Sequence, residues 1–486
     1  METNKRSSAD ISHVEKPSDS KLIDDDAELY GISHEEHNRT FRKVDWHLMP
    51  LLMALYLISN LDRANLGNAK IEGLEADLGM TGNDYNLANM MFFVPYILCE
   101  VPANTILLKF DKPSTWIGII VTAWGISRLL PGAAYLLSQW YPPNMTQFRM
   151  SMLYCAAAMS GAFSGLLAAG IAKMSGLAGY NGWRWIFIIE GVLTVVFGLA
   201  SFFLLPDSPA HSTRWLSETE IGYLQHLHKK YRGTRHQQED PLDEEAPAKR
   251  KEQWKILRSV VTDWQLYLQA FIFMSSSVPT YALKFTLPQI MVNMGFKSNE
   301  AQLLSAPPYV AGAISALVVA RFADRFSWRL PFIVGPQLCL MAAYAVLFSF
   351  SAEISTHVAL CYTFVHVATV SVYPIVPGGN TWTLNNLAGQ KKRAMGVAFM
   401  IALGNCGGII GSLIFKGSES PRYQTGWGTS LGFICAGIVA ATTLEVTYMF
   451  INKKRDKMSV EEVEATYTPD VLEAMGDRSP LFRYSL

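Results

Sequence analysis

The chain has 486 residues, of which 50% are hydrophobic and 17% are charged, and its formal net charge is zero. Soluble domains carry about 25% charged residues, so this composition argues against a soluble globular protein. A balanced charge gives no general attraction to nucleic acid, and we expect no nucleic-acid partner. The apolar residues form blocks of about 20, the length that a helix needs to cross roughly 30 Å of hydrocarbon. The sequence therefore predicts an all-α integral membrane protein.

Residues 1–44 are polar and partly acidic, and they end in a basic cluster at Arg39, Arg42 and Lys43. They contain no early apolar run of the kind that a signal peptide requires. This composition predicts a disordered tail.

Eleven apolar segments follow the tail. They lie at 46–66, 86–108, 115–140, 150–172, 184–205, 265–292, 302–320, 331–350, 357–379, 395–415 and 428–451. The first five predict an N-terminal helix bundle over 45–205, and the last six predict a C-terminal bundle over 264–451. Residues 452–486 then form a second tail.

A polar linker over 206–263 separates the two groups of spans. It opens with Pro206 and Pro209, which stop a helix, and Ser217 with Glu220 forms a capping box. We expect a short surface helix at 218–231, followed by a charged linker around 233–258.

Glycine pairs four residues apart occur in the second-last span of each group. Gly161 and Gly165 form the first pair, and Gly404, Gly407, Gly408 and Gly411 form two overlapping pairs. Small residues at this spacing let helix backbones approach closely in lipid. Their matching placement favours two related bundles, as in many transporters, although plain helix packing explains each pair equally well.

The distribution of basic residues gives the orientation of the second half. Basic clusters fill alternate loops at 321–329 and 391–393 and follow the last span at 453–457. Since such loops face the cytoplasm, the linker and the C-terminal tail are expected there. The basic N-terminal tail is also expected in the cytoplasm, yet five spans in the first half would put the linker on the other side of the membrane. The span at 115–140, with Arg128 near its middle, is interpreted as two spans fused by loss of sequence.

Several motifs resemble those of a known family. They are Lys43-Val44-Asp45-Trp46, Asp62-Arg63-x-Asn65-x-Gly67-Asn68-Ala69, Trp183-Arg184-Trp185-Ile186-Phe187-x-x-Glu190-Gly191 and Asn385-Asn386-x-Ala388-Gly389-x-x-Lys392-Arg393-Ala394. Over about residues 43–452 the chain resembles the fungal allantoate-permease branch of the anion:cation symporters, within the major facilitator superfamily.

The resemblance implies two pseudo-repeated six-helix bundles, alternating access and proton-coupled movement of small organic anions such as allantoate, nicotinate, pantothenate or biotin. Relative to that twelve-helix plan, the chain lacks the end of the third helix and the start of the fourth, between Ile126 and Leu130. The missing part would hold the fourth-helix arginine and a carboxylate credited with proton coupling in the family.

Charged residues within the spans are the candidates for substrate and proton binding, because an ionised side chain persists in a membrane only if it is paired or faces water. Arg63 suits bidentate capture of a carboxylate, and Asp62 beside it could orient Arg63 or bind a proton. An interface anchor is the alternative for Arg63. Glu100, in the second span, could bind and release a proton, or it could hydrogen-bond to a neighbouring helix.

The sixth apparent span carries Lys284 behind Tyr281. A lysine in a cavity supplies a positive charge, and a tyrosine adds a hydroxyl group and an aromatic face, so both are candidates for substrate binding. Tyr373, Asn380 and Asn405 are further candidates. A lone polar group on a membrane helix is most often satisfied by its neighbours, which is the alternative for each of these three.

The stretch Arg321-Phe-Ala-Asp324-Arg325-x-x-x-Arg329 resembles the superfamily's loop motif, which implies gating by Asp324, Arg325 and Arg329. A positive-inside anchor explains the same residues. No phosphate-binding glycine-rich loop is present. The six cysteines all lie in apolar spans, where a thiol behaves as a small hydrophobe, so we expect no disulfide, metal or cofactor.

The sequence thus predicts a secondary carrier and not an enzyme. Its expected partners are a small organic anion, protons and the lipid bilayer, and its expected state is a monomer in the plasma membrane. A membrane sensor that does not transport, or an inactive truncated carrier, remains the alternative.

Overall fold

A computed structural model describes residues 32–91, 93–94, 137, 140–141, 143–206, 209, 212–232, 246–325, 328–388, 390–468, 471–472 and 475–486. The helices of this part are α2 (His34–Ile71), α3 (Leu74–Asp77), α7 (Pro143–Ala172), α8 (Gly182–Leu204), α9 (Glu218–Arg232), α10 (Ala246–Val261), α11 (Trp264–Asn293), α12 (Ser298–Arg325), α13 (Pro331–Phe350), α14 (Val358–Asn385), α15 (Gln390–Ile414), α16 (Gln424–Arg455) and α17 (Val460–Thr466). Within these ranges the protein contains no β-strand.

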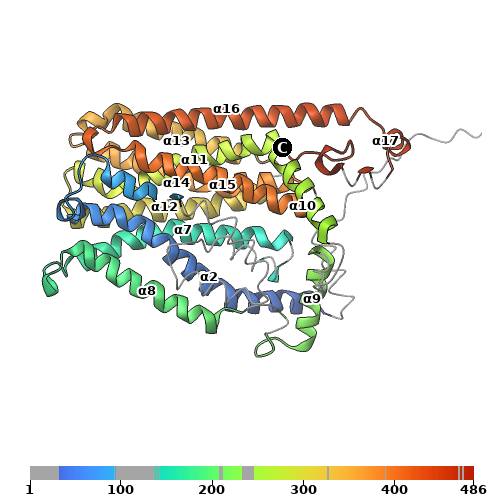
Figure 1. Ribbon diagram of the computed structural model, residues 1–486, viewed down its shortest axis with the longest axis horizontal. Helices are drawn as coiled ribbons and strands as arrows, with labels where there is room; N and C mark the ends of the chain where they lie inside the picture. The colour runs from blue at the N-terminus through green and yellow to red at the C-terminus, as the bar shows by residue number, and fades with distance from the viewer. Residues whose placement is uncertain are drawn as a thin grey trace, which may run out of the picture.

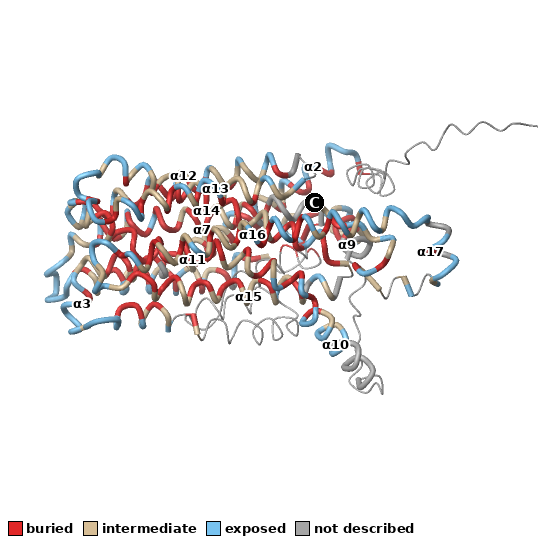
Figure 2. The backbone as a smooth tube through the Cα atoms, turned by 90° about the horizontal axis from the view of Figure 1, so that it is seen from above, coloured by how far each residue is buried: buried red, intermediate tan, exposed pale blue. Residues whose placement is uncertain are grey.

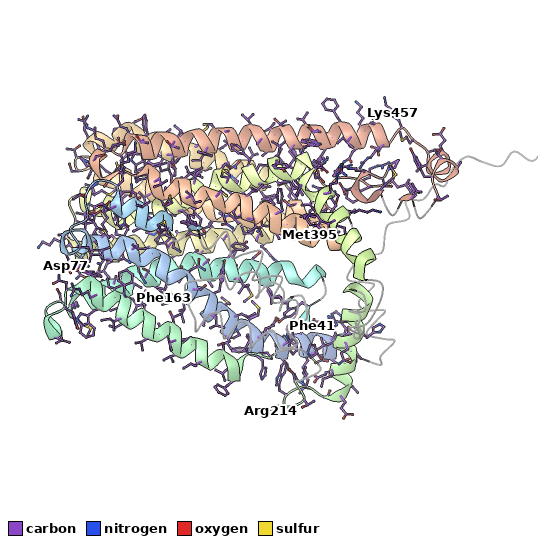
Figure 3. All side chains as sticks on the ribbon, viewed as in Figure 1. Phe41, Asp77, Phe163, Arg214, Met395 and Lys457 are labelled. Carbon is purple, nitrogen blue, oxygen red and sulfur yellow. The ribbon has the colours of Figure 1, made fainter. Side chains whose placement is uncertain are left out.

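The long helices lie side by side along the longest axis of the molecule, whereas α9 and α10 cross one end of them (Figure 1). We call this end the linker end and the opposite one, where α3 lies, the α3 end. Phe41 and Lys457 lie toward the linker end, and Asp77 lies at the α3 end (Figure 3). Buried positions run through the middle of the packed helices (Figure 2). The largest apolar cluster joins helices of the second bundle, and a separate cluster joins the first half of α2 to α7 and α9.

Eight helices of the described part are long and apolar enough to cross a membrane, and they belong to α2, α7, α8 and α12–α16. The thirty-residue α11, predicted as a span at 265–292, is not among these eight. It carries many polar side chains, yet most of its residues are buried by its neighbours. Its polarity is tolerated because protein, and not lipid, surrounds it.

The N-terminal tail is shorter than the sequence predicts. Helix α2 already begins at His34, where Ser33 and Glu36 form a capping box, so the expected disorder is wrong for residues 34–44. Phe41 and Val44 are buried in one apolar cluster with Tyr223 of α9. Contact with the linker helix therefore stabilises these turns, which a reading of the tail by itself cannot detect.

The described part of the linker contains two helices where one was expected. Helix α9 covers the predicted helix at 218–231, but α10 occupies the second half of the segment that was expected to be a charged linker. The predicted spans at 86–108 and 115–140 lie largely outside the described residues, as does the junction between Ile126 and Leu130.

The first glycine pair lies where α7 packs against α12. A Cβ atom at Gly161 would come within 2.7 Å of the Tyr309 ring, and one at Gly165 would come within 2.5 Å of the Gln302 carbonyl oxygen. Only hydrogen fits at such distances, so these glycines allow the two helices to touch. Since α7 and α12 belong to different halves of the chain, this contact joins the two bundles.

The second set of glycines packs α15 mainly against α11. Gly404 lies against the Phe273 ring, and Gly411 lies against the Val278 carbonyl oxygen. Gly408 instead lies against Phe93, from the first half of the chain. Both glycine sets therefore serve close packing, and each includes a contact between the halves.

Replacing Gly165 by alanine is expected to destabilise the protein. The nearest obstacle is a backbone oxygen, which cannot turn away as a side chain can, and overpacking of this kind costs about 1–3 kcal/mol. A Cβ atom on Gly170 of the same helix would meet no neighbouring segment within 4 Å, so Gly170→Ala is the matched control. Thermal unfolding of the purified proteins should show a lower midpoint for Gly165→Ala alone. Equal midpoints for the two variants would contradict the close-contact account.

Candidate functional site

Lys284 is a buried lysine at the contact between the two bundles. Its side chain is only 5% exposed, and its Nζ donates a hydrogen bond to the backbone carbonyl oxygen of Asn60 in α2 at 3.0 Å. Lys284 belongs to α11, in the second half of the chain. A cation in such a place needs negative or polar partners, because an unsolvated charge is costly.

The backbones of α2 and α11 approach closely beside Lys284. A Cβ atom on Gly67 would lie 2.9 Å from the Phe285 carbonyl oxygen, and the Tyr85 hydroxyl donates to that same oxygen at 3.2 Å. Asn60 also bonds within its own helix, from Nδ2 to the Tyr56 carbonyl oxygen at 2.9 Å. The sequence places Gly67 in a motif, and its lack of a side chain is what permits this crossing.

The crossing includes the helix that carries the predicted anion ligand. Arg63 follows Asn60 by three residues, so its backbone lies almost one helical turn from the Lys284 contact. The side chains of Arg63 and Asp62 lie outside the described part, as does the whole of Glu100. The roles predicted for these three residues remain predictions.

Tyr281 belongs to an aromatic group one turn before Lys284. Its ring stacks on Phe285 with centroids 6.2 Å apart, and the Phe93 ring meets it edge-on at 4.9 Å. Phe93 and Phe285 are both buried. The segment of α11 that carries Lys284 therefore also packs rings contributed by both halves of the chain.

The remaining predicted substrate residues lie on α14 and α15. Asn380 donates from Nδ2 to the Tyr154 hydroxyl of α7 at 2.8 Å, and the Tyr373 ring meets Tyr309 of α12 edge-on at 6.4 Å. Asn405 is buried on α15, beside the glycine that packs against α11. Asn380 thus joins the two bundles directly, whereas Tyr373 packs within the second.

A buried polar network in the first bundle was not predicted. Asn68 donates from Nδ2 to the Ser164 hydroxyl at 2.7 Å, and Ser164 donates to Asn65 Oδ1 at 2.9 Å. All three side chains are at most 2% exposed. The spacing of three residues between Asn65 and Asn68 places both on one helix face, a signal that could have identified them.

A polar contact joins the bundles at the α3 end. The carboxylate of Glu72, just after α2, accepts hydrogen bonds from the Ser298 hydroxyl at 2.5 Å and from Gln302 Nε2 at 2.9 Å, both on α12. Gln302 is also the residue whose backbone meets Gly165. Lys284 therefore lies between two polar contacts that join the bundles. One is formed by Glu72 at the α3 end, and the other is the Asn380–Tyr154 hydrogen bond nearer the linker end.

The sequence matches the profile of the Major Facilitator Superfamily over residues 113–412, which is more than half of the chain. The chain belongs to the Major Facilitator Superfamily. It is therefore an integral multi-pass membrane protein of a transporter family and not an enzyme.

Relatives match over almost the whole length. The chain is 33% identical over 493 positions to the MFS-type transporter cnsO of Penicillium expansum, covering 93% of this chain and 92% of the relative. It is 28% identical over 486 positions to the high-affinity nicotinic acid transporter of Saccharomyces cerevisiae, covering 95% and 87%. The first alignment covers about 452 residues of this chain, so about 40 of its positions lack a residue here.

Solved structures support the superfamily fold. A bacterial homologue of the human lysosomal transporter Spinster, inward-facing and occupied, has a TM-score of 0.58 with 12% identity, and covers 85% of this chain and 98% of its own. A D-xylose–proton symporter has a TM-score of 0.53 with 15% identity, covering 82% and 96%. At these identities the likeness concerns the fold alone.

Within this superfamily fold, the first motif of the chain ties α2 to its neighbours at the linker end. Asp45 binds Arg149 of α7 through two hydrogen bonds of 2.9 and 2.7 Å, and it accepts a third from the Tyr141 hydroxyl at 2.7 Å. Lys43 pairs with Glu220 of α9 at 2.6 Å. The motif therefore has a structural role, since it fixes the linker helix and α7 to the start of α2.

The predicted gating residues lie at the linker end of the second bundle. Arg329 donates from Nη1 to the Ala323 carbonyl oxygen at 2.8 Å, and its backbone N–H donates to the Leu486 oxygen at 2.7 Å. The side chains of Asp324 and Arg325 are outside the described part. The Arg329 contacts named here lie within the second half, and the gating role stays a prediction.

The segment 475–486, which we call the strap, binds across the linker end of the second bundle. Asn386 both donates to the Ser485 carbonyl oxygen at 3.0 Å and accepts from the Ser485 N–H at 2.7 Å. Lys392 bridges Asp263, at the start of α11, and Asp477 of the strap, at 2.8 and 2.7 Å. The motif at 385–394 is therefore the docking surface of the strap.

Weakening this docking surface should lower stability. Asn386→Ala removes two hydrogen bonds to the Ser485 backbone, each contributing about 0.5–1.5 kcal/mol. Arg483→Ala is the matched control, because the ion pair between Arg483 and Asp456 is exposed and such pairs contribute little. Thermal unfolding should show a lower midpoint for Asn386→Ala only. A strap that contributes nothing would leave both midpoints at the wild-type value.

The motif at Trp183 and Arg184 holds the turn at the α3 end. Trp183 Nε1 and Arg184 Nη2 donate to Asp77 Oδ2 at 2.9 and 3.0 Å. The hydrogen bond from Trp183 and the positive charge of Arg184 together hold the pKa of Asp77 below its usual 3.8, although desolvation acts in the opposite direction. The contact therefore favours the ionised carboxylate.

The stability supplied by Asp77 is expected to depend on pH. A lowered pKa in the folded protein means that the contribution is complete above about pH 5 and disappears as the pH falls through the folded pKa, below 3.8. The contribution of Asp77 to stability is measured by thermal unfolding of the wild type and of Asp77→Asn across pH 3 to 7. The wild type should be the more stable at neutral pH, and the difference should shrink toward pH 3. A constant difference would contradict the assignment.

Proposed function

We propose that the protein is a secondary active transporter that moves a small organic anion, with protons, by alternating access between its two bundles. The observation that carries this proposal is the buried Lys284, a cation placed where the two halves of a major facilitator fold meet. In this superfamily plan, substrates bind at the interface of the repeats. A fixed positive charge there favours a carboxylate or another anion.

The aromatic group near Lys284 in α11 supports a planar substrate. Tyr281 and Phe285, one turn before and one residue after Lys284, pack with each other and with Phe93. A ring carboxylate would pair its charge with Lys284 and stack its ring on this group. The nicotinic acid transporter among the relatives is consistent with such a substrate, and it supports the proposed membership of the allantoate-permease branch.

Arg63 is proposed as the second anion ligand, since its backbone lies almost one turn from the Lys284 contact. Asp62 and Glu100 are proposed for proton coupling. Tyr373, Asn380 and Asn405 are proposed to contact substrate, and Asp324, Arg325 and Arg329 to gate the linker end. The basic loops at that end support a cytoplasmic orientation, and the plasma membrane is the proposed location of the monomer.

Uptake of labelled small carboxylates at acid and neutral pH, in transporter-deficient yeast, tests the proposal. Lys284→Ala should reduce uptake about tenfold or more, because a hydrogen bond to a charged group contributes about 1.5–3 kcal/mol and 1.4 kcal/mol is a factor of ten. Lys297→Ala is the control, since this exposed lysine precedes α12 at the α3 end. Uptake should be faster at acid pH. Equal uptake by both variants at equal surface expression would remove Lys284 from the site.

A second function is a membrane sensor, or an inactive carrier, descended from a transporter. The roughly 40 aligned positions of the Penicillium relative that are absent here favour it, as does the odd number of predicted spans in the first half. Comparing this chain with a version in which the missing helical hairpin is restored distinguishes a transporter from a sensor. If only the restored version takes up an anion, while this chain binds the same anion without uptake, the sensor is correct.

A further inference from the structure

Helix α10 presents an exposed apolar stripe beside a cluster of basic residues. Trp254 is 62% exposed, and Leu257 and Val261 are also exposed. Their spacing of three and four residues places them on one face of the helix. Lys255 and Arg258 are exposed as well, and over its whole length α10 contains five basic residues and one acidic residue. Such a helix is typical of a membrane surface.

The end of α10 is packed against the second bundle. Val260, next to the exposed stripe, is fully buried in an apolar cluster with Leu387 and Met400. The turn into α11 is closed by the Tyr267 hydroxyl, which donates to the Val261 carbonyl oxygen at 2.8 Å, and Asp263 at the start of α11 pairs with Lys392. These contacts fix the end of α10 from which the exposed stripe begins.

The orientation of α10 suits a helix lying in the plane of a membrane. It crosses the linker end of the long helices (Figure 1) and leaves the edge of the bundle sideways (Figure 2). Its sixteen residues give it a length of about 24 Å, too short to span a bilayer. Since the long helices cross the membrane, a helix across their ends lies along its surface.

The apolar stripe also continues into the membrane-facing surface of the protein. Trp264 and Tyr267, at the start of α11, are exposed and lie shortly after Val261. Tryptophan and tyrosine concentrate at the level of the lipid headgroups. The α10 stripe therefore meets the surface that the bilayer already covers, at the headgroup level.

We propose that α10 is a lipid-binding helix that lies on the anionic leaflet at the linker end, with Trp254, Leu257 and Val261 in the headgroup region and Lys255 and Arg258 on lipid phosphates and carboxylates. The positive charge of α10 is complementary to the negative charge of this leaflet. The basic loops at 321–329 and 391–393 lie on the same side of the membrane as α10. The helix thereby anchors the linker between the two bundles to the membrane.

Hydrogen exchange of the full chain in lipid nanodiscs tests this proposal without any transport measurement. Backbone amides of 254–261 should exchange about tenfold more slowly in discs of phosphatidylcholine with phosphatidylserine than in phosphatidylcholine alone. The double variant Lys255→Ala/Arg258→Ala should lose this difference. Lys453→Ala/Lys454→Ala removes the same charge from the exposed end of α16 and should retain it.

Three results would overturn the proposal. Equal exchange of α10 in neutral and anionic discs would exclude recognition of anionic lipid. Protection in neutral detergent micelles equal to that in the anionic discs would exclude anionic lipid as the cause of the protection. Protection that rises with protein concentration, together with a dimer by size, would assign the stripe to a second copy of the chain. Trp254→Ala should weaken protection in both kinds of disc, which tests the apolar part separately.

Discussion

The polar helix α11 in the middle of the molecule is the constraint on which the rest of the structure depends. Inside a membrane backbone polar groups need hydrogen-bond partners within the protein, and buried polar side chains are costly without them. Two prolines, Pro279 and Pro288, also remove backbone donors from α11. A helix of this kind cannot face lipid, so its neighbours must surround it and must supply hydrogen bonds.

Partners for α11 come from both bundles and from the strap. Gln337 of α13 donates to Ser275 at 3.1 Å, and the Tyr344 hydroxyl donates to the Pro279 carbonyl oxygen at 2.9 Å. At the linker end Gln265 donates to Tyr484 of the strap at 3.1 Å. At the other end of α11, Tyr85 from the first half binds the Phe285 carbonyl oxygen. The second bundle is thus assembled around one helix that the first bundle and the strap also hold.

Much of the fold follows from the sequence, because long apolar runs have few alternatives in lipid. The predicted span at 331–350 coincides with α13, and the span at 265–292 differs from α11 by one residue at each end. The sequence-based predictions fail where a helix is stabilised by contacts with other parts of the chain. The first turns of α2 depend on α9, and α10 was missed because its apolar residues are spread over a charged stretch and form a stripe only on a helix.

The site was predicted less completely than the fold. Lys284 and Tyr281 stand out in the sequence because charge and aromatic hydroxyl are unusual within a span, and the structure places both at the bundle contact. One partner of Lys284 is the backbone carbonyl group of Asn60, and no residue type marks such a group in a sequence. The Asn380–Tyr154 bond joins residues 226 positions apart, which residue spacing cannot reveal.

The contact between Lys284 and Asn60 has a consequence for a carrier that works by alternating access. The two residues belong to different bundles, and the bundles of such a carrier rotate against each other. If rotation separates Lys284 from Asn60, the hydrogen bond of 3.0 Å breaks, and the loss of one partner of a buried ammonium group is unfavourable. A bound anion would offset this cost, because it would supply Lys284 with a partner that can move with the second bundle. Substrate binding and bundle rotation would then be coupled through the same charge, so that the empty carrier rotates less readily than the loaded one.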